Sequence, residues 1–211
     1  MISIIGLGFV GLTTALGLAD KGFKVFGYEI DQERRNQIND GIIPFHEPQL
    51  SKMLLKHKKN NNFQIISNFK EAIQKSNIIF LCVGTPSKEN GAVDLSFIEQ
   101  AIENIFTSLD SSTKSRIICI KSTVPPETTK YFQKKFSEKN HTKFNNKIGF
   151  VSNPEFLREG YAWEDFMNPD RIIIGSDSPN NFPLMRELYG VFNSEIYCVN
   201  STTAEFIKYS S

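Results

Sequence analysis

The 211-residue sequence has no long hydrophobic run, no excess of one charge and only three cysteines. No apolar segment approaches the roughly 20 residues that cross a bilayer, and the opening MISIIGLGFVGL lacks the basic region of a secretory signal peptide. We therefore expect a cytoplasmic protein that has no membrane partner. A formal net charge of +1 provides no broad basic surface, so we also expect no nucleic acid partner.

The cysteines, Cys82, Cys119 and Cys198, are widely separated, and each lies within an apolar run. An odd and widely spaced set of cysteines is neither a disulfide framework nor a metal site. We interpret all three as buried, unreactive thiols and predict no metal centre.

Short runs rich in β-branched residues alternate with amphipathic stretches along the chain, and 40% of the residues are hydrophobic. Strands that alternate with helices and read as continuous apolar runs are typical of a mostly parallel sheet covered on both faces. The sequence therefore predicts a doubly wound α/β fold of the Rossmann type, and it predicts a solvated loop at residues 56–62. The predicted strands are ISIIG, KVFGYE, QIIS, NIIFLCVG, RIICIKS, KIGFVS, RIIIGS and EIYCVN. The predicted helices cover residues 9–21, 31–40, 68–74, 96–108, 125–135, 181–192 and 201 onward.

A glycine-rich turn, GLGFVG, follows the first predicted strand and opens the first predicted helix. Its first glycine permits a tight turn, the second lets a pyrophosphate approach the backbone, and the third allows close packing of the helix. Free N–H groups at the helix start face the anion. The motif predicts a dinucleotide site formed by Gly6, Gly8, Phe9, Val10 and Gly11.

The second predicted strand ends in Glu29, at the spacing from the glycines where dinucleotide-binding folds place an acid. A carboxylate there accepts hydrogen bonds from the adenosine ribose and repels a 2′-phosphate, so it favours NAD over NADP. Arg34 leaves a second interpretation open, because a guanidinium at this place can hold a phosphate or stack on adenine.

Two later predicted strands end in loops of a similar kind, VGTP and STVPP. Ligands of open α/β sheets bind at the carboxyl ends of the strands, so both loops are expected to flank the same crevice. Taken singly, each loop is also typical of an ordinary turn that caps a helix. The candidate cofactor residues in these loops are Val83, Gly84, Thr85, Pro86 and Thr123.

The segments IIGLGFVGL, NIIFLCVGTP, IKSTVPPET, NPEFLREGYAWEDFMNPDRIIIG and AEFIKY, in this order, resemble the NAD-binding domain of the UDP-glucose/GDP-mannose dehydrogenase family. The stretch from NPEFLREG to NPDRIIIG most resembles the UDP-glucose 6-dehydrogenase branch. The resemblance implies an NAD-dependent oxidoreductase of nucleotide-sugar metabolism and polysaccharide biosynthesis. Such an enzyme oxidises the C6 alcohol of UDP-glucose to UDP-glucuronate with two NAD+, through a cysteine thioester.

The resemblance also implies a domain organisation and leaves alternatives. Residues 1–200 would form the NAD-binding domain, and residues 201–211 would begin a central helix through which the full-length parent forms a homodimer. A GDP-mannose or UDP-N-acetylhexosamine dehydrogenase remains an alternative, as does a stand-alone module that senses NAD.

The resemblance assigns roles to four side chains. Thr123 and Glu155 would lie near the reacting carbon, with Glu155 as a general base for thioester hydrolysis. Glu159 would face the nicotinamide side of the cofactor, and Lys208 would supply positive charge to the alkoxide and oxyanion. The substrate-binding residues would be Glu155, Phe156, Leu157, Arg158 and Lys208.

We expect a short helical turn after Pro154 to place Glu155 and Glu159 on one face, where two acids can serve one cleft. Without the resemblance, these acids are more typical of a solvated first helical turn that complements the helix dipole. The family's nucleophilic cysteine lies in a GGxCxPKD context, and the sequence contains no such segment. We therefore expect a part of a longer enzyme, which binds NAD but does not complete the oxidation alone.

Overall fold

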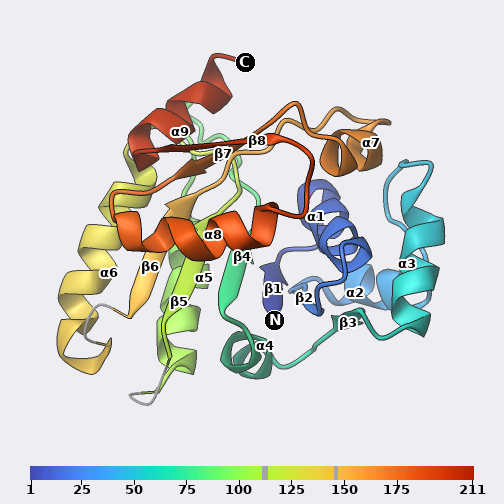
Figure 1. The fold of residues 1–211 in the computed structure, drawn as a ribbon. Helices are drawn as coiled ribbons and strands as arrows, with labels where there is room; N and C mark the ends of the chain where they lie inside the picture. Colours follow the sequence, from blue (N-terminus) through green and yellow to red (C-terminus); the bar gives the residue numbers. More distant parts are fainter. Residues whose placement is uncertain (111–113, 145–146) are drawn as a thin grey trace.

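The computed structural model describes residues 1–110, 114–144 and 147–211. In this part of the chain one sheet has the strand order β3-β2-β1-β4-β5-β6-β7-β8 (Figure 1). The strands from β1 to β6 pair in parallel, β7 meets β6 in an antiparallel bridge, and β8 runs parallel to β7. The order of the first six strands is that of dinucleotide-binding sheets, with its switch point between β1 and β4. The predicted doubly wound α/β fold is confirmed.

The predicted strands all form. They are β1 (Ile2–Ile5), β2 (Val25–Tyr28), β3 (Phe63–Ile65), β4 (Ile78–Leu81), β5 (Arg116–Ile120), β6 (Ile148–Ser152), β7 (Arg171–Gly175) and β8 (Glu195–Val199). The helices are α1 (Phe9–Asp20), α2 (Gln32–Asn39), α3 (Leu50–Lys59), α4 (Phe69–Lys75), α5 (Ser96–Ser108), α6 (Thr128–Phe144), α7 (Ala162–Met167), α8 (Phe182–Tyr189) and α9 (Ser201–Tyr209), with a 3₁₀ turn, η1 (Pro179–Asn181), before α8.

Apolar side chains of the central strands alternate between two cores. On β4, Ile78 and Phe80 join a cluster with buried residues of α1, α3, α7 and α8, whereas Ile79 and Leu81 join a cluster with residues of α4, α5 and α6. Successive side chains of a strand point to opposite faces, so a strand that is apolar throughout needs helices on both sides. The two layers hold the carboxyl ends of β1, β4 and β5 at one edge, where the site forms.

Two predictions of local structure are wrong. No helix was predicted at residues 50–59, and the stretch 56–62 was predicted as a solvated loop, but α3 forms and continues to Lys59 because Leu50, Leu54 and His57 of this helix are buried against the rest of the protein. The helix predicted to end at residue 135 continues to Phe144, whose buried ring joins the core with Phe136. In both cases tertiary burial stabilises helix in a polar sequence.

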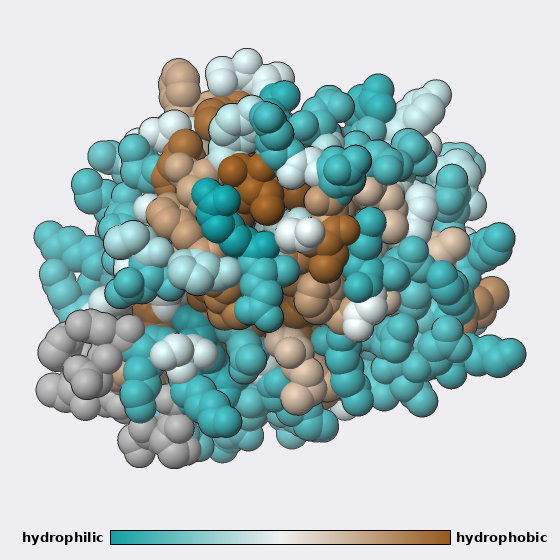
Figure 2. Space-filling view, viewed as in Figure 1, coloured by the Kyte–Doolittle hydropathy of each residue, from teal (hydrophilic) through white to brown (hydrophobic). Residues whose placement is uncertain are grey.

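The edge strand β8 is only partly covered. Figure 2 shows a face that is mostly hydrophilic, with hydrophobic residues visible near its centre, where β8 and α8 lie in Figure 1. Tyr197 on β8 and Val191 after α8 are among the exposed hydrophobic residues. Throughout the described ranges, no helix combines the length and hydropathy that a membrane crossing requires.

Candidate functional site

The glycine turn between β1 and α1 has the geometry of an anion cradle. Gly6 has a φ of +89°, which side chains other than glycine rarely adopt. A Cβ atom on Gly11 would lie 1.9 Å from the Gly6 carbonyl oxygen, so only glycine lets α1 start this close to β1. Beside Gly8 there is no atom within 4 Å of a Cβ position, and no side chain caps the start of α1. The open space and the uncapped helix start fit a pyrophosphate.

Glu29, immediately after β2, is buried and tied to the glycine turn. Its carboxylate accepts hydrogen bonds from the backbone N–H of Leu7 at 2.8 Å and of Asp31 at 3.0 Å. Arg34 lies 3.6 Å from the same carboxylate. A carboxylate has about four lone-pair sites, so Glu29 keeps acceptor capacity for ribose hydroxyls while its position is fixed.

A cavity of about 550 Å³ runs from Glu29 and Arg34, past the glycine turn, to Thr123 and Glu155. Of the residues predicted to bind the cofactor, it is lined by Gly6, Gly8, Phe9, Val10, Glu29, Arg34, Val83, Gly84, Thr85 and Thr123. Gly11 instead packs beneath the turn, and Pro86 and Glu159 are not among the lining residues. These ligand contacts stay predictions, but the structure brings most of the residues to one cavity.

A second cavity, of about 610 Å³, lies under the segment between β6 and β7. The predicted substrate residues Glu155, Phe156, Leu157, Arg158 and Lys208 all line it. Lys121 and Glu155 line both cavities, so the two spaces meet at these side chains. The first cavity thus adjoins the second at one ammonium group and one carboxylate.

Glu155 is held at this junction by two contacts. Lys208 of α9 forms an ion pair with one carboxylate oxygen at 2.9 Å, and the other oxygen accepts a hydrogen bond from the Leu157 N–H at 2.6 Å. Lys208 and Arg171 also lie against the Phe156 ring, with centroid distances of 5.7 and 4.8 Å. The geometry brings Glu155 and Lys208 together, as the sequence predicts, and their catalytic roles stay predictions.

The predicted helical turn after Pro154 is wrong. Residues 153–158 have no regular structure, and α7 begins only at Ala162. The Glu155 carboxylate bonds to Leu157 two residues on, a local contact that competes with a helix. Glu155 and Glu159 therefore do not share a helical face, and Glu159 is exposed.

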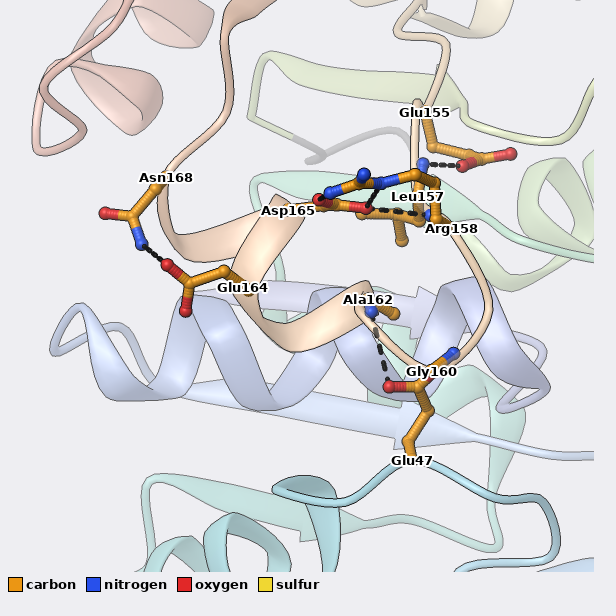
Figure 3. A network of polar contacts seen from close by, with 9 residues as sticks. All are labelled: Glu47, Glu155, Leu157, Arg158, Gly160, Ala162, Glu164, Asp165 and Asn168. Carbon is orange, nitrogen blue, oxygen red and sulfur yellow. Dashed lines mark hydrogen bonds and ion pairs between the residues drawn. The ribbon is translucent and has the colours of Figure 1, made fainter.

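Side chains far apart in sequence fix this loop instead (Figure 3). The Glu47 carboxylate accepts hydrogen bonds from the Gly160 N–H at 2.5 Å and the Ala162 N–H at 3.2 Å, which caps α7 from the segment before α3. The Arg158 guanidinium pairs with Asp165 at 2.7 Å, which holds the pKa of that carboxyl below its usual range. The loop is thus held at Arg158 by Asp165 and at Gly160 and Ala162 by Glu47, without a ligand.

Lys121 and Asn153 were not singled out from the sequence, yet they form a buried polar group at the junction. The Lys121 ammonium donates to Asn153 Oδ1 at 3.1 Å, and the Tyr189 hydroxyl donates to the same oxygen at 2.5 Å. Asn153 Nδ2 donates to the Ile173 carbonyl at 2.8 Å. Burial lowers the pKa of Lys121. A lysine that directly closes the apolar run RIICI is the sequence signal that could have found it.

Burial raises the pKa of the Cys82 thiol to about 12 and raises the pKa of Cys119 as well. Both thiols are therefore protonated at neutral pH, as expected for unreactive cysteines. Of the three cysteines predicted to be buried, Cys119 is buried, whereas Cys82 and Cys198 are partly exposed. In the described residues, no group of histidine, cysteine and acidic side chains is arranged to hold a metal ion.

Glu205 positions α9, and with it Lys208. Its buried carboxylate accepts hydrogen bonds from the Thr129 N–H at 2.7 Å and the Thr129 hydroxyl at 2.6 Å, at the start of α6. Burial raises the pKa of Glu205, although both bonds from Thr129 lower it. Folding therefore favours the protonated carboxyl.

This raised pKa predicts a pH-dependent stability. The contribution of Glu205 to the free energy of unfolding is complete below the unfolded pKa, near 4.5, and is lost as pH rises through the folded pKa. We expect Glu205→Gln to lose less stability than the wild type over this range, because its side chain does not ionise. Urea unfolding at a series of pH values measures the difference. The exposed Glu187→Gln is the control, and an E205Q profile parallel to the wild type would contradict the prediction.

The sequence model for the NAD-binding domain of the UDP-glucose/GDP-mannose dehydrogenase family matches residues 1–193. The chain belongs to this family. NAD is accordingly the cofactor of the domain, which has a Rossmann-type fold. The glycine turn, the uncapped helix start and Glu29 all fit this dinucleotide.

Relatives of this UDP-glucose/GDP-mannose dehydrogenase domain are longer proteins. An uncharacterized protein of Methanocaldococcus jannaschii, MJ1054, is 41% identical over 216 residues, which cover 100% of this chain and 23% of that protein. The UDP-glucose 6-dehydrogenase of Rickettsia bellii is 35% identical over 213 residues, which cover 100% of this chain and 47% of that protein. The chain thus spans about half the length, or less, of these relatives.

Solved structures of the family have the same fold. A GDP-mannose dehydrogenase from Pseudomonas aeruginosa has a TM-score of 0.93 at 33% identity, covering 99% of this chain and 48% of the other. A UDP-glucose dehydrogenase from Pyrobaculum islandicum has a TM-score of 0.93 at 30% identity, with the same coverage of 99% and 48%. The fold and the family are shared by enzymes with two different sugar substrates.

Proposed function

We propose that the chain is the NAD-binding domain of a UDP-glucose 6-dehydrogenase, which oxidises the C6 alcohol of UDP-glucose to the carboxylate of UDP-glucuronate with two NAD+. The observation that supports this most directly is the meeting of two cavities at Glu155, with Lys208 paired to it at 2.9 Å. Both cavities have the volume of typical small-molecule sites. A pure NAD sensor has no need of the second cavity or of its acid and lysine pair.

Bound NAD+ supplies a hydride acceptor for the C6 carbon. In the proposed reaction, the Lys208 ammonium stabilises negative charge that develops on the C6 oxygen. The Glu155 carboxylate takes the alcohol proton through a water, and later activates the water that hydrolyses the thioester. Thr123 and the backbone of residues 156–158 orient the sugar. Each of these groups lines one of the two cavities.

The second oxidation needs a thiolate, and the described cysteines do not supply one. Cys82 lines the cofactor cavity, but burial raises its pKa to about 12, so it has almost no nucleophilic form at neutral pH. We therefore propose that this chain alone binds NAD+ without sustaining the four-electron oxidation.

GDP-mannose is a second candidate substrate, favoured by the similarity to the Pseudomonas aeruginosa enzyme.

Titration of the purified chain with NAD+ in a calorimeter is expected to show saturable binding at one site, and NADP+ is expected to bind more weakly because Glu29 repels its 2′-phosphate. In an absorbance assay with UDP-glucose and NAD+, we expect no steady production of NADH. A folded chain that releases no heat with NAD+ would refute the cofactor site. Continuous NADH production would refute the inactivity of the chain but not its family.

A further inference from the structure

Lys121 is a buried cation that the proposed reaction does not use. It follows β5 directly, its backbone N–H donates to the Leu81 carbonyl at 2.9 Å, and the residue is only 5% exposed. In the described part of the chain, its ammonium has one hydrogen-bond acceptor, the uncharged Asn153 side chain at 3.1 Å. Burying an ammonium without a carboxylate partner costs stability, so this lysine is not explained by packing.

The charges around Lys121 do not cancel. The ionisable groups that face it are Cys82, Cys119, Glu155 and Lys208. Both thiols are protonated because burial raises their pKa values, and Lys208 is paired with Glu155 at 2.9 Å. Two ammonium groups and one carboxylate leave a net charge of one positive unit, and Lys121 is the ammonium without an ion pair.

The excess charge lies at a defined end of the cofactor cavity. A dinucleotide crosses this type of sheet at the switch point, with adenosine over β2 and the second nucleotide half over the strands beyond β1. Glu29 and Arg34 line the end near β2, and Lys121, Thr123 and Glu155 line the end near β4 and β5. The nicotinamide half is the part of the cofactor that changes charge, because its ring is cationic when oxidised and neutral when reduced.

We infer that Lys121 is a further functional residue of the cofactor site, whose uncompensated positive charge favours reduced over oxidised nicotinamide. A cation here opposes NAD+ and does not oppose NADH, so it makes bound NAD+ the stronger hydride acceptor. The energetic reason is Coulombic repulsion in a site with little water, where screening by salt is weak. The inference rests on the proposed function in one respect, that the nicotinamide half of NAD lies at the end of the cavity where Lys121 is.

The test compares the dissociation constants of NAD+ and NADH in charge variants of the purified chain, by calorimetry for NAD+ and by nicotinamide fluorescence for NADH. Lys121→Met removes the charge with little change of shape, and Lys121→Gln also keeps a donor for Asn153. We expect the ratio of the NAD+ dissociation constant to the NADH dissociation constant to fall about tenfold in both variants. This is the effect expected when one charge is removed near another at a dielectric constant between those of water and of dry protein. Glu155→Gln, which removes a negative charge at the same end, is expected to raise the ratio.

Two variants control for shape and for general charge. Lys121→Arg keeps the cation, and Lys130→Met removes an exposed lysine on α6, so both are expected to keep the wild-type ratio within about twofold. Urea unfolding supplies an independent readout, since K121M should be at least as stable as the wild type, with Tyr189 still bonded to Asn153. An unchanged ratio in both K121M and K121Q would overturn the inference while leaving NAD binding intact. A folded wild-type chain that binds neither form of the cofactor would overturn the proposed function as well.

Discussion

Replacing Gly8 by alanine is expected to weaken NAD+ binding strongly and leave the fold intact, whereas replacing Gly11 by alanine should damage both. At Gly8 the backbone has a φ of −72°, which alanine adopts freely, and no atom lies within 4 Å of the new methyl group. The methyl group would instead fill the space of the pyrophosphate. We expect the affinity of Gly8→Ala for NAD+ to fall by about a hundredfold or more, which corresponds to about 2.7 kcal/mol.

Gly11→Ala is the matched variant, since it adds the same methyl group three residues away. That methyl group would lie 1.9 Å from the Gly6 carbonyl oxygen, so α1 must move away from β1. We expect the free energy of unfolding to fall by about 3 kcal/mol or more, at the upper end of overpacking effects. Urea unfolding and calorimetry with NAD+ separate the two cases. A Gly8→Ala protein that binds NAD+ normally would show that the pyrophosphate does not lie on this turn.

The sheet and the glycine turn could be predicted because their signals are local. The strands are short, mostly apolar runs, as in IIFL of β4, and their alternation with helices favours a mostly parallel, doubly wound sheet. Gly6, Gly11 and Glu29 have fixed spacings in sequence that follow from the geometry of one β-α-β unit. Such signals give the cofactor end of the site without a structure.

The junction of the two cavities could not be derived in the same way, because its contacts join residues that are distant in sequence. Lys121 meets Asn153 across neighbouring strands, 32 residues apart, and Glu47 caps the start of α7 across 113 residues. No periodicity marks such pairs. The false helical turn at Glu155 has this origin in part, because the loop takes its shape from the distant Glu47 as well as from the nearby contacts of Glu155 with Leu157 and of Arg158 with Asp165.

Asn153→Ala is expected to be among the most destabilising single changes in the site. The substitution would leave the Lys121 ammonium, the Tyr189 hydroxyl and the Ile173 carbonyl without their partner in the protein interior. Leaving a buried charge and two buried polar groups without hydrogen-bond partners lowers the free energy of unfolding by about 3–5 kcal/mol. Urea unfolding of the purified variant measures this loss as a lower midpoint with an unchanged slope.

Two further variants show whether the stranded ammonium is the main cause of this loss. Tyr189→Phe removes one hydroxyl and leaves Asn153 bonded to Lys121, so it should cost only about 1 kcal/mol. In a Lys121→Met background no ammonium remains to be stranded, and we expect the penalty of Asn153→Ala to be smaller by about 1–3 kcal/mol. Equal penalties in the two backgrounds would place the cost in the lost packing of Asn153 rather than in charge. A smaller penalty in the Lys121→Met background would show that Asn153 makes a buried lysine tolerable at the point where the two cavities meet.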